Sequence, residues 1–244
     1  MTGPNPIRDR TLWLTVLAIW LALRFYWPFP QLVWWQTMGL LYGLLMIGAI
    51  VIMGGKLRYV FDAEDKIYAD STGGWHWRRS WIILPVLAAI WILVLGLTAM
   101  TGTFHVDPAR FDILLMVFAT QVFMVGLGEE LFFREAGIKA SAGNPIWLFV
   151  FAVGLFGAIH WQGGVFAILV AVGLGAVYLA TRLAGVPILI VALMHGINNT
   201  VSRYVIWLDI SNQVVYAVLF VLGCFALAAA IVALAGVYER RRGP

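Results

Sequence analysis

Apolar residues form eight runs along the chain that are long enough to cross a bilayer, and short polar connections separate them. A transmembrane helix needs about 20 apolar residues. The run at 145–161 is the shortest of the eight and falls near the lower limit for a span. The pattern predicts an all-α fold, a polytopic bundle of about eight transmembrane helices that forms a single integral membrane domain over residues 1–244. The runs lie at about 11–28, 32–54, 81–100, 112–135, 145–161, 164–183, 187–206 and 213–237.

Composition agrees with a membrane location. Hydrophobic residues make up 62% of the chain and charged residues 11%, whereas an ordinary soluble domain has about 25% charged residues. The net charge of +4 comes from basic residues beside apolar runs, so we expect contact with a lipid bilayer and none with nucleic acid. The single cysteine, Cys224, excludes an internal disulfide and a cysteine metal cluster.

Lysine and arginine are distributed unevenly between the two ends of the predicted bundle. If the chain crosses eight times, only Arg24, Arg110 and Arg203 of the 16 Lys and Arg residues lie opposite the termini. The positive-inside rule then places both termini in the cytoplasm, and the polar loop at 56–80 with them. Compact loops and an arginine-rich C-terminus are interpreted as typical of a prokaryotic inner-membrane protein.

Two adjacent glutamates, Glu129 and Glu130, lie toward the end of the fourth run. An ionisable group inside a membrane segment is costly and marks a candidate functional site. Glu130 and Arg134 are spaced i,i+4 with the acid first, which predicts an ion pair and a supporting role. Neighbouring helical residues point about 100° apart, so Glu129 is expected to face elsewhere, without a local partner, as a candidate general base.

Two histidines, His160 and His195, lie within the predicted spans. His195 and Asn199 share a helix face because they are spaced i,i+4, and Phe156 and His160 have the same spacing. With Glu129, these residues supply a carboxylate and two imidazoles from three helices. Such a set could bind a divalent metal and its water, or it could activate a water directly while His and Asn stabilise an oxyanion. The spacing leaves both possibilities open.

Each of these polar residues also has a structural explanation. A histidine inside a membrane is often a hydrogen-bond partner between helices, and Gln121 is more often a packing contact. Glu135 and Lys139 are interpreted as charges at the cytoplasmic edge. Depth is the weak point of the predicted site, because the rise per residue places His160 deeper from the cytoplasmic side than Glu129. The site is expected to be reached from the cytoplasmic half.

Three motifs in this order resemble those of a known family. The motifs are Glu129-Glu130-x-x-x-Arg134, Phe156-x-x-x-His160 and His195-x-x-x-Asn199, within a core at about 110–206. They are similar to the signatures of the CAAX protease and bacteriocin-processing family, the intramembrane proteases related to type II CAAX prenyl endopeptidase.

The resemblance implies an intramembrane endopeptidase that hydrolyses a membrane-tethered, lipidated or otherwise hydrophobic peptide or protein. It implies that Glu129, His160, His195 and Asn199 are catalytic and that Glu130 and Arg134 support them. Members are commonly called metalloproteases, and the ligands of a metal such as zinc would be Glu129, His160 and His195. In a bacterium, bacteriocin or peptide processing would be the natural role.

Two alternatives to an enzyme stay open. The first is a non-catalytic membrane scaffold or immunity protein that keeps the motifs. The second is a proton-coupled transporter that uses the glutamates and histidines as a relay. The chain shows no internal repeat of the kind that many transporters have, which counts against the second alternative.

Overall fold

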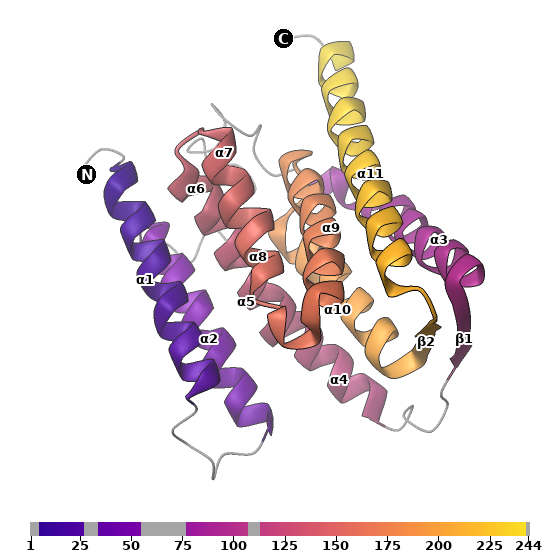
Figure 1. Cartoon of the computed structure of the whole chain (residues 1–244). Coiled ribbons are helices and arrows are strands. Elements are labelled where there is room, and N and C mark those ends of the chain that lie inside the picture. Colours follow the sequence, from indigo (N-terminus) through magenta and orange to yellow (C-terminus); the bar gives the residue numbers. More distant parts are fainter. Residues whose placement is uncertain (1–4, 27–33, 55–76, 107–112, 243–244) are drawn as a thin grey trace.

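A computed structural model describes residues 5–26, 34–54, 77–106 and 113–242 and shows a mostly helical molecule (Figure 1). The first half contains α1 (Pro6–Phe25), α2 (Trp34–Ile52), the 3-10 helix η2 (Trp77–Ile82), α3 (Ile83–Thr101) and strand β1 (Gly102–Val106). A long helical segment, 114–141, comprises α4 (Leu114–Thr120), η4 (Gln121–Gly126), α5 (Leu127–Glu129), η5 (Glu130–Ala136) and α6 (Gly137–Ser141).

The second half begins with the segment 145–158, which comprises α7 (Pro145–Phe149), η6 (Val150–Gly154) and α8 (Leu155–Ala158). The 3-10 helix η7 (Trp161–Gly163), α9 (Gly164–Leu183), α10 (Ile188–Thr200), η8 (Val201–Val205), strand β2 (Ile206–Ile210) and α11 (Gln213–Arg242) follow. Four of these segments, η4, η5, η6 and η8, are π-helical. Such turns are frequent at functional sites.

The helices form three groups side by side (Figure 1). The pair α1–α2 packs on one side of the segment 114–141, and α3 and α11 pack together on the other side of the molecule. The central group, from α4 to α10, carries all three sequence motifs. The start of α1 and the end of α11 lie at the same end of the bundle (Figure 1), and we call this the terminal end.

Four helices are long and apolar enough to cross a membrane, among the residues that the structure describes: Arg79–Thr101, Leu114–Ser141, Trp161–Leu183 and Gln213–Val237. Two shorter apolar helices, Gln36–Ile52 and Pro145–Ala158, accompany them. The predicted runs 11–28 and 187–206 are largely helical but are not among these six. The chain is therefore an integral membrane protein, while eight crossings and cytoplasmic termini stay predictions.

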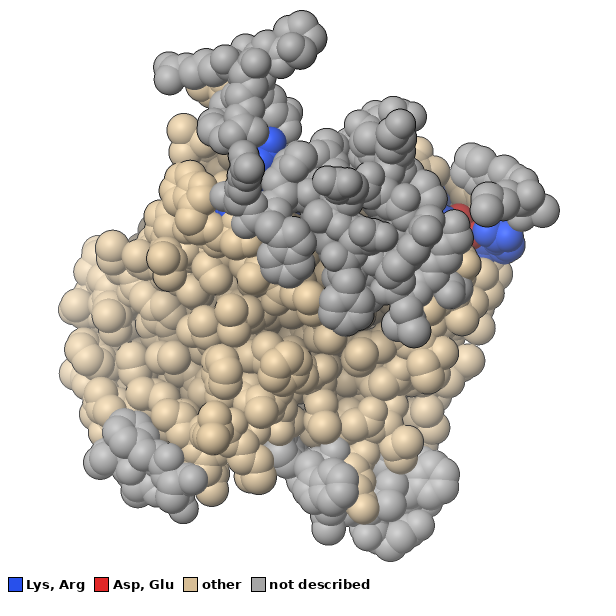
Figure 2. Space-filling view, turned by 180° about the vertical axis from the view of Figure 1, so that it is seen from behind, with Lys and Arg blue, Asp and Glu red and all other residues tan. Residues whose placement is uncertain are grey.

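The surface agrees with this location. Figure 2 shows a broad tan face without charged side chains across the middle of the described part, and the blue and red atoms in view lie at the upper end. Large apolar side chains such as Leu115, Leu84 and Ile92 are exposed. An apolar belt of this kind suits contact with lipid tails.

Local signals in the sequence begin and end these helices. Asn5 caps α1 by accepting a hydrogen bond from the Arg8 backbone, and Asn144 caps the segment 145–158 in the same way. A proline follows each cap at the first helical position, where its missing N–H costs nothing. Gly143 has a φ of 79°, and this left-handed turn reverses the chain between the fourth and fifth predicted spans.

A close helix–helix contact brings the motifs together. A Cβ on Gly196 would lie 2.7 Å from the Cα of Val122, and one on Gly126 would lie 2.8 Å from the Ala192 carbonyl oxygen. No side chain fits at either glycine, so α10 and η4 approach backbone to backbone, as small residues permit in membranes. This contact holds His195 and Asn199 of α10 against the segment that carries both glutamates.

Basic side chains at the terminal end cap the carboxyl ends of helices. Arg10 donates to the carbonyls of Ala140 and Ser141, at the end of α6, and Arg79 donates to the Ala184 carbonyl after α9. Lys139 donates to the Ile52 carbonyl at the end of α2. These carbonyls have no partner inside their own helices. The excess of basic residues at this end thus has a structural use besides any role in topology.

The interpretation of Glu135 and Lys139 as edge charges needs correction for Glu135. Glu135 is buried and forms an ion pair with Arg182 of α9, which is also fully buried. Lys139 is partly exposed and lies 4.0 Å from Asp9. The predicted loop at 56–80 falls mostly outside the described residues.

The all-α prediction is wrong at one place. Strands β1 and β2 pair antiparallel, with Gly102 opposite Ile210 and Val106 opposite Ile206. A Cβ on Gly102 would lie 1.9 Å from the Asp209 carbonyl oxygen, so only glycine fits there. The predicted seventh span consequently ends at Val205 in η8, and the strand follows from Ile206.

Removal of one partner of the buried pair is expected to destabilise the protein strongly. Glu135→Ala leaves the Arg182 guanidinium buried without its carboxylate, which should cost about 3–5 kcal/mol. Thermal unfolding of the purified protein in detergent measures the effect. The control Arg8→Ala removes a half-exposed pair with Asp9 and should change stability by less than about 1 kcal/mol.

The double variant Glu135→Leu/Arg182→Leu distinguishes the cost of an unpaired buried charge from the loss of side-chain packing. It removes both charges, so it should recover most of the stability that Glu135→Ala loses. A double variant that is less stable than Glu135→Ala would contradict this account of the pair.

Candidate functional site

The two glutamates hold one imidazole between them. His195 Nδ1 lies 2.8 Å from Glu130 Oε1, and His195 Nε2 lies 3.6 Å from Glu129 Oε2. All three side chains are buried. The prediction that the glutamates point in different directions is therefore refined, because they approach opposite nitrogens of the same ring. A carboxylate accepts, so Nδ1–H donates to Glu130 and Nε2 is left to face Glu129.

The predicted pairing of Glu130 with Arg134 is present. Arg134 Nε lies 3.1 Å from Glu130 Oε2, and both side chains are completely buried. The contact is an ion pair without aligned hydrogen-bond geometry, and the Arg134 nitrogens have no hydrogen-bond partner among the described residues. Glu130 therefore meets Arg134 and His195 at once.

Aromatic rings complete the surroundings of this cation. The Arg134 guanidinium carbon lies 4.0 Å from the Phe156 ring centre and 5.4 Å from that of Tyr178. Cation–π contacts of this kind gain strength when water is excluded. Phe156 also meets the rings of His160 and His195 edge to face. The first residue of the second motif thus packs against members of all three motifs.

A hydrogen-bonded chain fixes the other face of His195. Tyr178 of α9 stacks on the imidazole with ring centres 5.0 Å apart. Asn198 donates to the Tyr178 hydroxyl at 3.0 Å and accepts from Trp91 Nε1 of α3 at 3.0 Å. Asn198 is therefore a structural link between three helices. Its neighbour Asn199 lines a cavity.

Glu129, His160 and Asn199 line one cavity of about 330 Å³. His160 Nδ1 lies 2.8 Å from the Phe156 carbonyl oxygen. A carbonyl only accepts, so Nδ1 carries the proton and Nε2 is an available acceptor. Glu129 and His160 therefore reach one cavity, although the rise per residue had placed His160 deeper in the bundle. His195 does not line this cavity but contacts it through Glu129.

Asn199 has a defined orientation. Its Nδ2 donates to Oε1 of Gln121 at 3.1 Å. Gln121 is buried and lines the same cavity, so it does more than the packing that was expected of it. One Nδ2 proton and the carbonyl oxygen of Asn199 are then free of this contact.

The rest of the cavity lining comes from helices outside the motifs. Tyr42 of α2 lines the cavity and interacts with the Glu129 carboxylate. Arg24 of α1 and Arg203 of η8 line it as well, together with further residues from α2, η7 and η8: Thr37, Met38, Leu41, Gln162 and Tyr204. Tyr42 and Arg24 carry no local sequence signal. Arg203 could have been found, because it lies four residues beyond Asn199.

The cavity lies away from the terminal end. Arg24 is near the end of α1, Gln162 is between α8 and α9, and Arg203 is near the end of η8. All these points are at the end of the bundle opposite both termini (Figure 1). Two expectations therefore conflict, since cytoplasmic termini and access from the cytoplasmic half cannot both hold.

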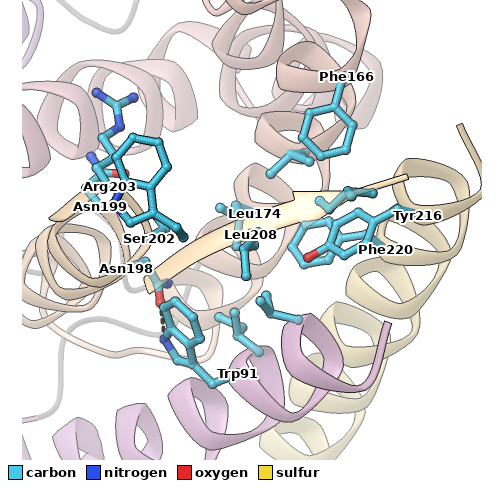
Figure 3. Close-up of a pocket in the computed structure, with 15 residues that line it drawn as sticks. Trp91, Phe166, Leu174, Asn198, Asn199, Ser202, Arg203, Leu208, Tyr216 and Phe220 are labelled. Atoms are coloured by element: carbon cyan, nitrogen blue, oxygen red, sulfur yellow. Dashed lines mark hydrogen bonds between the residues drawn. The ribbon is translucent and has the colours of Figure 1, made fainter. Parts of the chain in front are cut away.

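A second cavity of about 440 Å³ adjoins the first (Figure 3). It lies among α3, α9, α10, β2 and α11, and Asn199 and Arg203 line both cavities. The lining is otherwise mostly apolar and aromatic, and Phe166 and Phe220 lie at the part remote from Arg203 (Figure 3). A polar cavity with a carboxylate thus stands beside an apolar one.

The predicted metal ligands do not assemble into a metal-binding group. Glu129 and His195 approach each other, but no group of three His, Cys, Asp or Glu side chains suited to a metal occurs in the described part of the chain. Zinc usually has at least three protein ligands. The donor set does not fit that requirement, and no chemical step is derived through a metal.

Comparison with known proteins identifies the motif-bearing part of the chain. No curated protein and no solved structure matches the chain. Residues 111–201 match the family model described as type II CAAX prenyl endopeptidase Rce1-like. The matched range contains all three motifs and lies within the predicted core at 110–206. The part of the chain that carries the motifs is therefore similar to the Rce1-like type II CAAX prenyl endopeptidases, the family that the motifs resemble.

Proposed function

We propose that this protein is an intramembrane endopeptidase that hydrolyses a peptide bond with a water activated by Glu129. The observation that carries the proposal is the juxtaposition of Glu129, His160 and Asn199 in one cavity. A protease-family domain covers the same residues. The cavity offers a base, a second proton carrier and an amide donor within a largely apolar molecule.

Glu129 is the general base in this proposal. Its Oε2 has no hydrogen-bond partner among the described residues, and it faces His195 Nε2 at 3.6 Å. The Glu129 side chain also lines the cavity, where a water can donate a proton to its carboxylate. Glu129 takes a proton from the water while the water oxygen forms a bond to the scissile carbonyl carbon.

The remaining residues stabilise charge and move the proton. The free Nδ2–H of Asn199 donates to the carbonyl oxygen as it becomes an oxyanion. The C–N bond then breaks, and the leaving amine takes the proton from Glu129, with His160 Nε2 as an intermediate carrier. Glu130 and Arg134 touch no substrate and position His195. No zinc takes part in these steps.

The substrate of this reaction is a hydrophobic or membrane-associated peptide. The apolar cavity shares Asn199 and Arg203 with the polar one, so an apolar group can lie beside the reacting bond. Lipidated peptides and bacteriocin-like peptides both have this character. A prokaryotic inner membrane is the proposed location.

Glu129→Gln is expected to lower the rate of peptide cleavage by about 10²–10⁴-fold, since an amide cannot accept the water proton. The assay uses purified protein in nanodiscs and a fluorogenic apolar peptide. Asp209→Asn makes the same chemical change on exposed strand β2 and should leave the rate unchanged. Full cleavage activity of Glu129→Gln would overturn the assignment of Glu129 as the base, and no cleavage by the unchanged protein would favour a scaffold or a transporter.

Glu130→Leu should differ from Glu129→Gln in its effect on stability. Loss of Glu130 leaves Arg134 as an unpaired buried cation and removes the Nδ1 partner of His195, so both activity and about 3–5 kcal/mol of stability should be lost. Glu129→Gln should lose activity with little change in thermal unfolding. Equal stability of the two variants would argue against a positioning role for Glu130.

Cysteine labelling tests the side from which the cavity is reached. If the termini are cytoplasmic, Gln162→Cys near the cavity should react with a membrane-impermeant maleimide in intact cells, and Ile7→Cys at the terminal end should not. Both variants carry Cys224→Ala. The reverse pattern would overturn the predicted orientation, and reaction of both from the same side would contradict the fold.

A further inference from the structure

Two arginines line the cavity of Glu129. Arg24 of α1 is half-buried, and Arg203 of η8 is exposed. Neither forms an ion pair with an acidic residue in the part of the chain that the structure describes. The steps of peptide hydrolysis proposed for Glu129, His160 and Asn199 use neither arginine.

Arg24 and Arg203 lie at the end of the bundle where few basic residues are expected. In the topology predicted from the sequence, most Lys and Arg residues lie on the side of the termini, and Arg24 and Arg203 are two of the three that lie opposite. A cation inside or at the edge of a membrane bundle is costly and is generally retained for function. Both of these cations line the same cavity.

Each arginine is held on a structured helix face. The Arg24 guanidinium carbon lies 4.8 Å from the ring centre of Trp20, which precedes it by one helical turn on α1. Arg203 continues the face of His195 and Asn199 by another four residues. The rise of a helix places it about 12 Å along the axis from His195, so it lies toward the mouth of the cavity while the glutamates lie at depth.

The charges that line the cavity do not balance. The lining contains Arg24 and Arg203 but only one carboxylate, that of Glu129. With His160 neutral, the side chains that line the cavity carry one net positive charge. An anion bound beside the arginines would compensate it, and arginine binds a carboxylate through two parallel hydrogen bonds.

We propose that Arg24 and Arg203 form a subsite for a carboxylate of the peptide substrate. The inference rests on the proposed peptidase function and specifies its substrate as a peptide that is apolar near the scissile bond and carries a carboxylate nearby. The carboxylate belongs either to an acidic side chain or to the free C-terminus. The arginines would draw this group to the mouth and orient the chain toward Glu129.

Peptide binding to the full-length Glu129→Gln protein in nanodiscs of neutral lipid tests the subsite without cleavage. Four fluorescein-labelled apolar hexapeptides serve as probes: a free acid, its C-terminal amide, the amide with one Glu, and the amide with Gln at that position. Fluorescence anisotropy gives each Kd. At least one carboxylate peptide should bind about ten-fold or more tightly than its neutral partner. A difference between the free acid and its amide indicates the C-terminal carboxylate, and a difference between the Glu and Gln peptides indicates an acidic side chain.

Variants assign this preference to the arginines. Arg24→Gln and Arg203→Gln should each reduce the preference, and the double variant should abolish it. Arg8→Gln makes the same change at the other end of α1 and should leave the preference intact. Equal binding of charged and neutral peptides, no binding of either, or a preference that survives the double variant overturns the proposal.

Two further outcomes are informative. In a parallel assay with phosphatidylglycerol nanodiscs, if the double variant loses lipid binding and keeps the peptide preference, the arginines are lipid anchors and the subsite is overturned. In an active wild-type protein, Arg203→Gln should raise KM for the carboxylate peptide with little change in kcat. Cleavage of charged and neutral peptides with equal KM would overturn the subsite and keep the peptidase, whereas selective binding without cleavage would keep the subsite and overturn the peptidase.

Discussion

The backbone contact between α10 and η4 is the constraint on which the site depends. Gly196 and Gly126 leave no room for a side chain, so the two segments lie closer than most helices. Only at this separation can His195 reach Glu129 and Glu130, and Asn199 reach Gln121. In a bilayer, where apolar burial gives little drive to association, such close packing and interhelical hydrogen bonds are the main sources of specificity.

The buried charges of Arg134 and Glu130 each have more than one partner. Arg134 has the Glu130 carboxylate on one side and the Phe156 and Tyr178 rings on the others. Glu130 in turn has both Arg134 and His195. An isolated charge in this setting would cost several kcal/mol, so Arg134 and Glu130 depend on these partners, and Glu130 also fixes the imidazole that faces Glu129.

In the proposed peptidase, the two neighbouring cavities have different roles. The polar cavity collects Glu129, His160 and Asn199, and the apolar cavity offers space beside them. Asn199 and Arg203 lie at the boundary. A substrate held in this way would have its apolar portion out of water and its reacting bond among hydrogen-bonding groups, which is the condition under which preorganised donors are most effective.

The sequence by itself determined the membrane character, the helical segments and the pairing of Glu130 with Arg134, because hydropathy and i,i+4 spacing are local properties. The three motifs also singled out the residues that the proposed reaction uses. Only the tertiary structure decided that both glutamates meet His195, that Glu135 is buried against Arg182, and that the cavity lies opposite the termini. These facts depend on contacts between helices far apart in the chain, and a backbone approach at glycine leaves no periodic signal in the sequence.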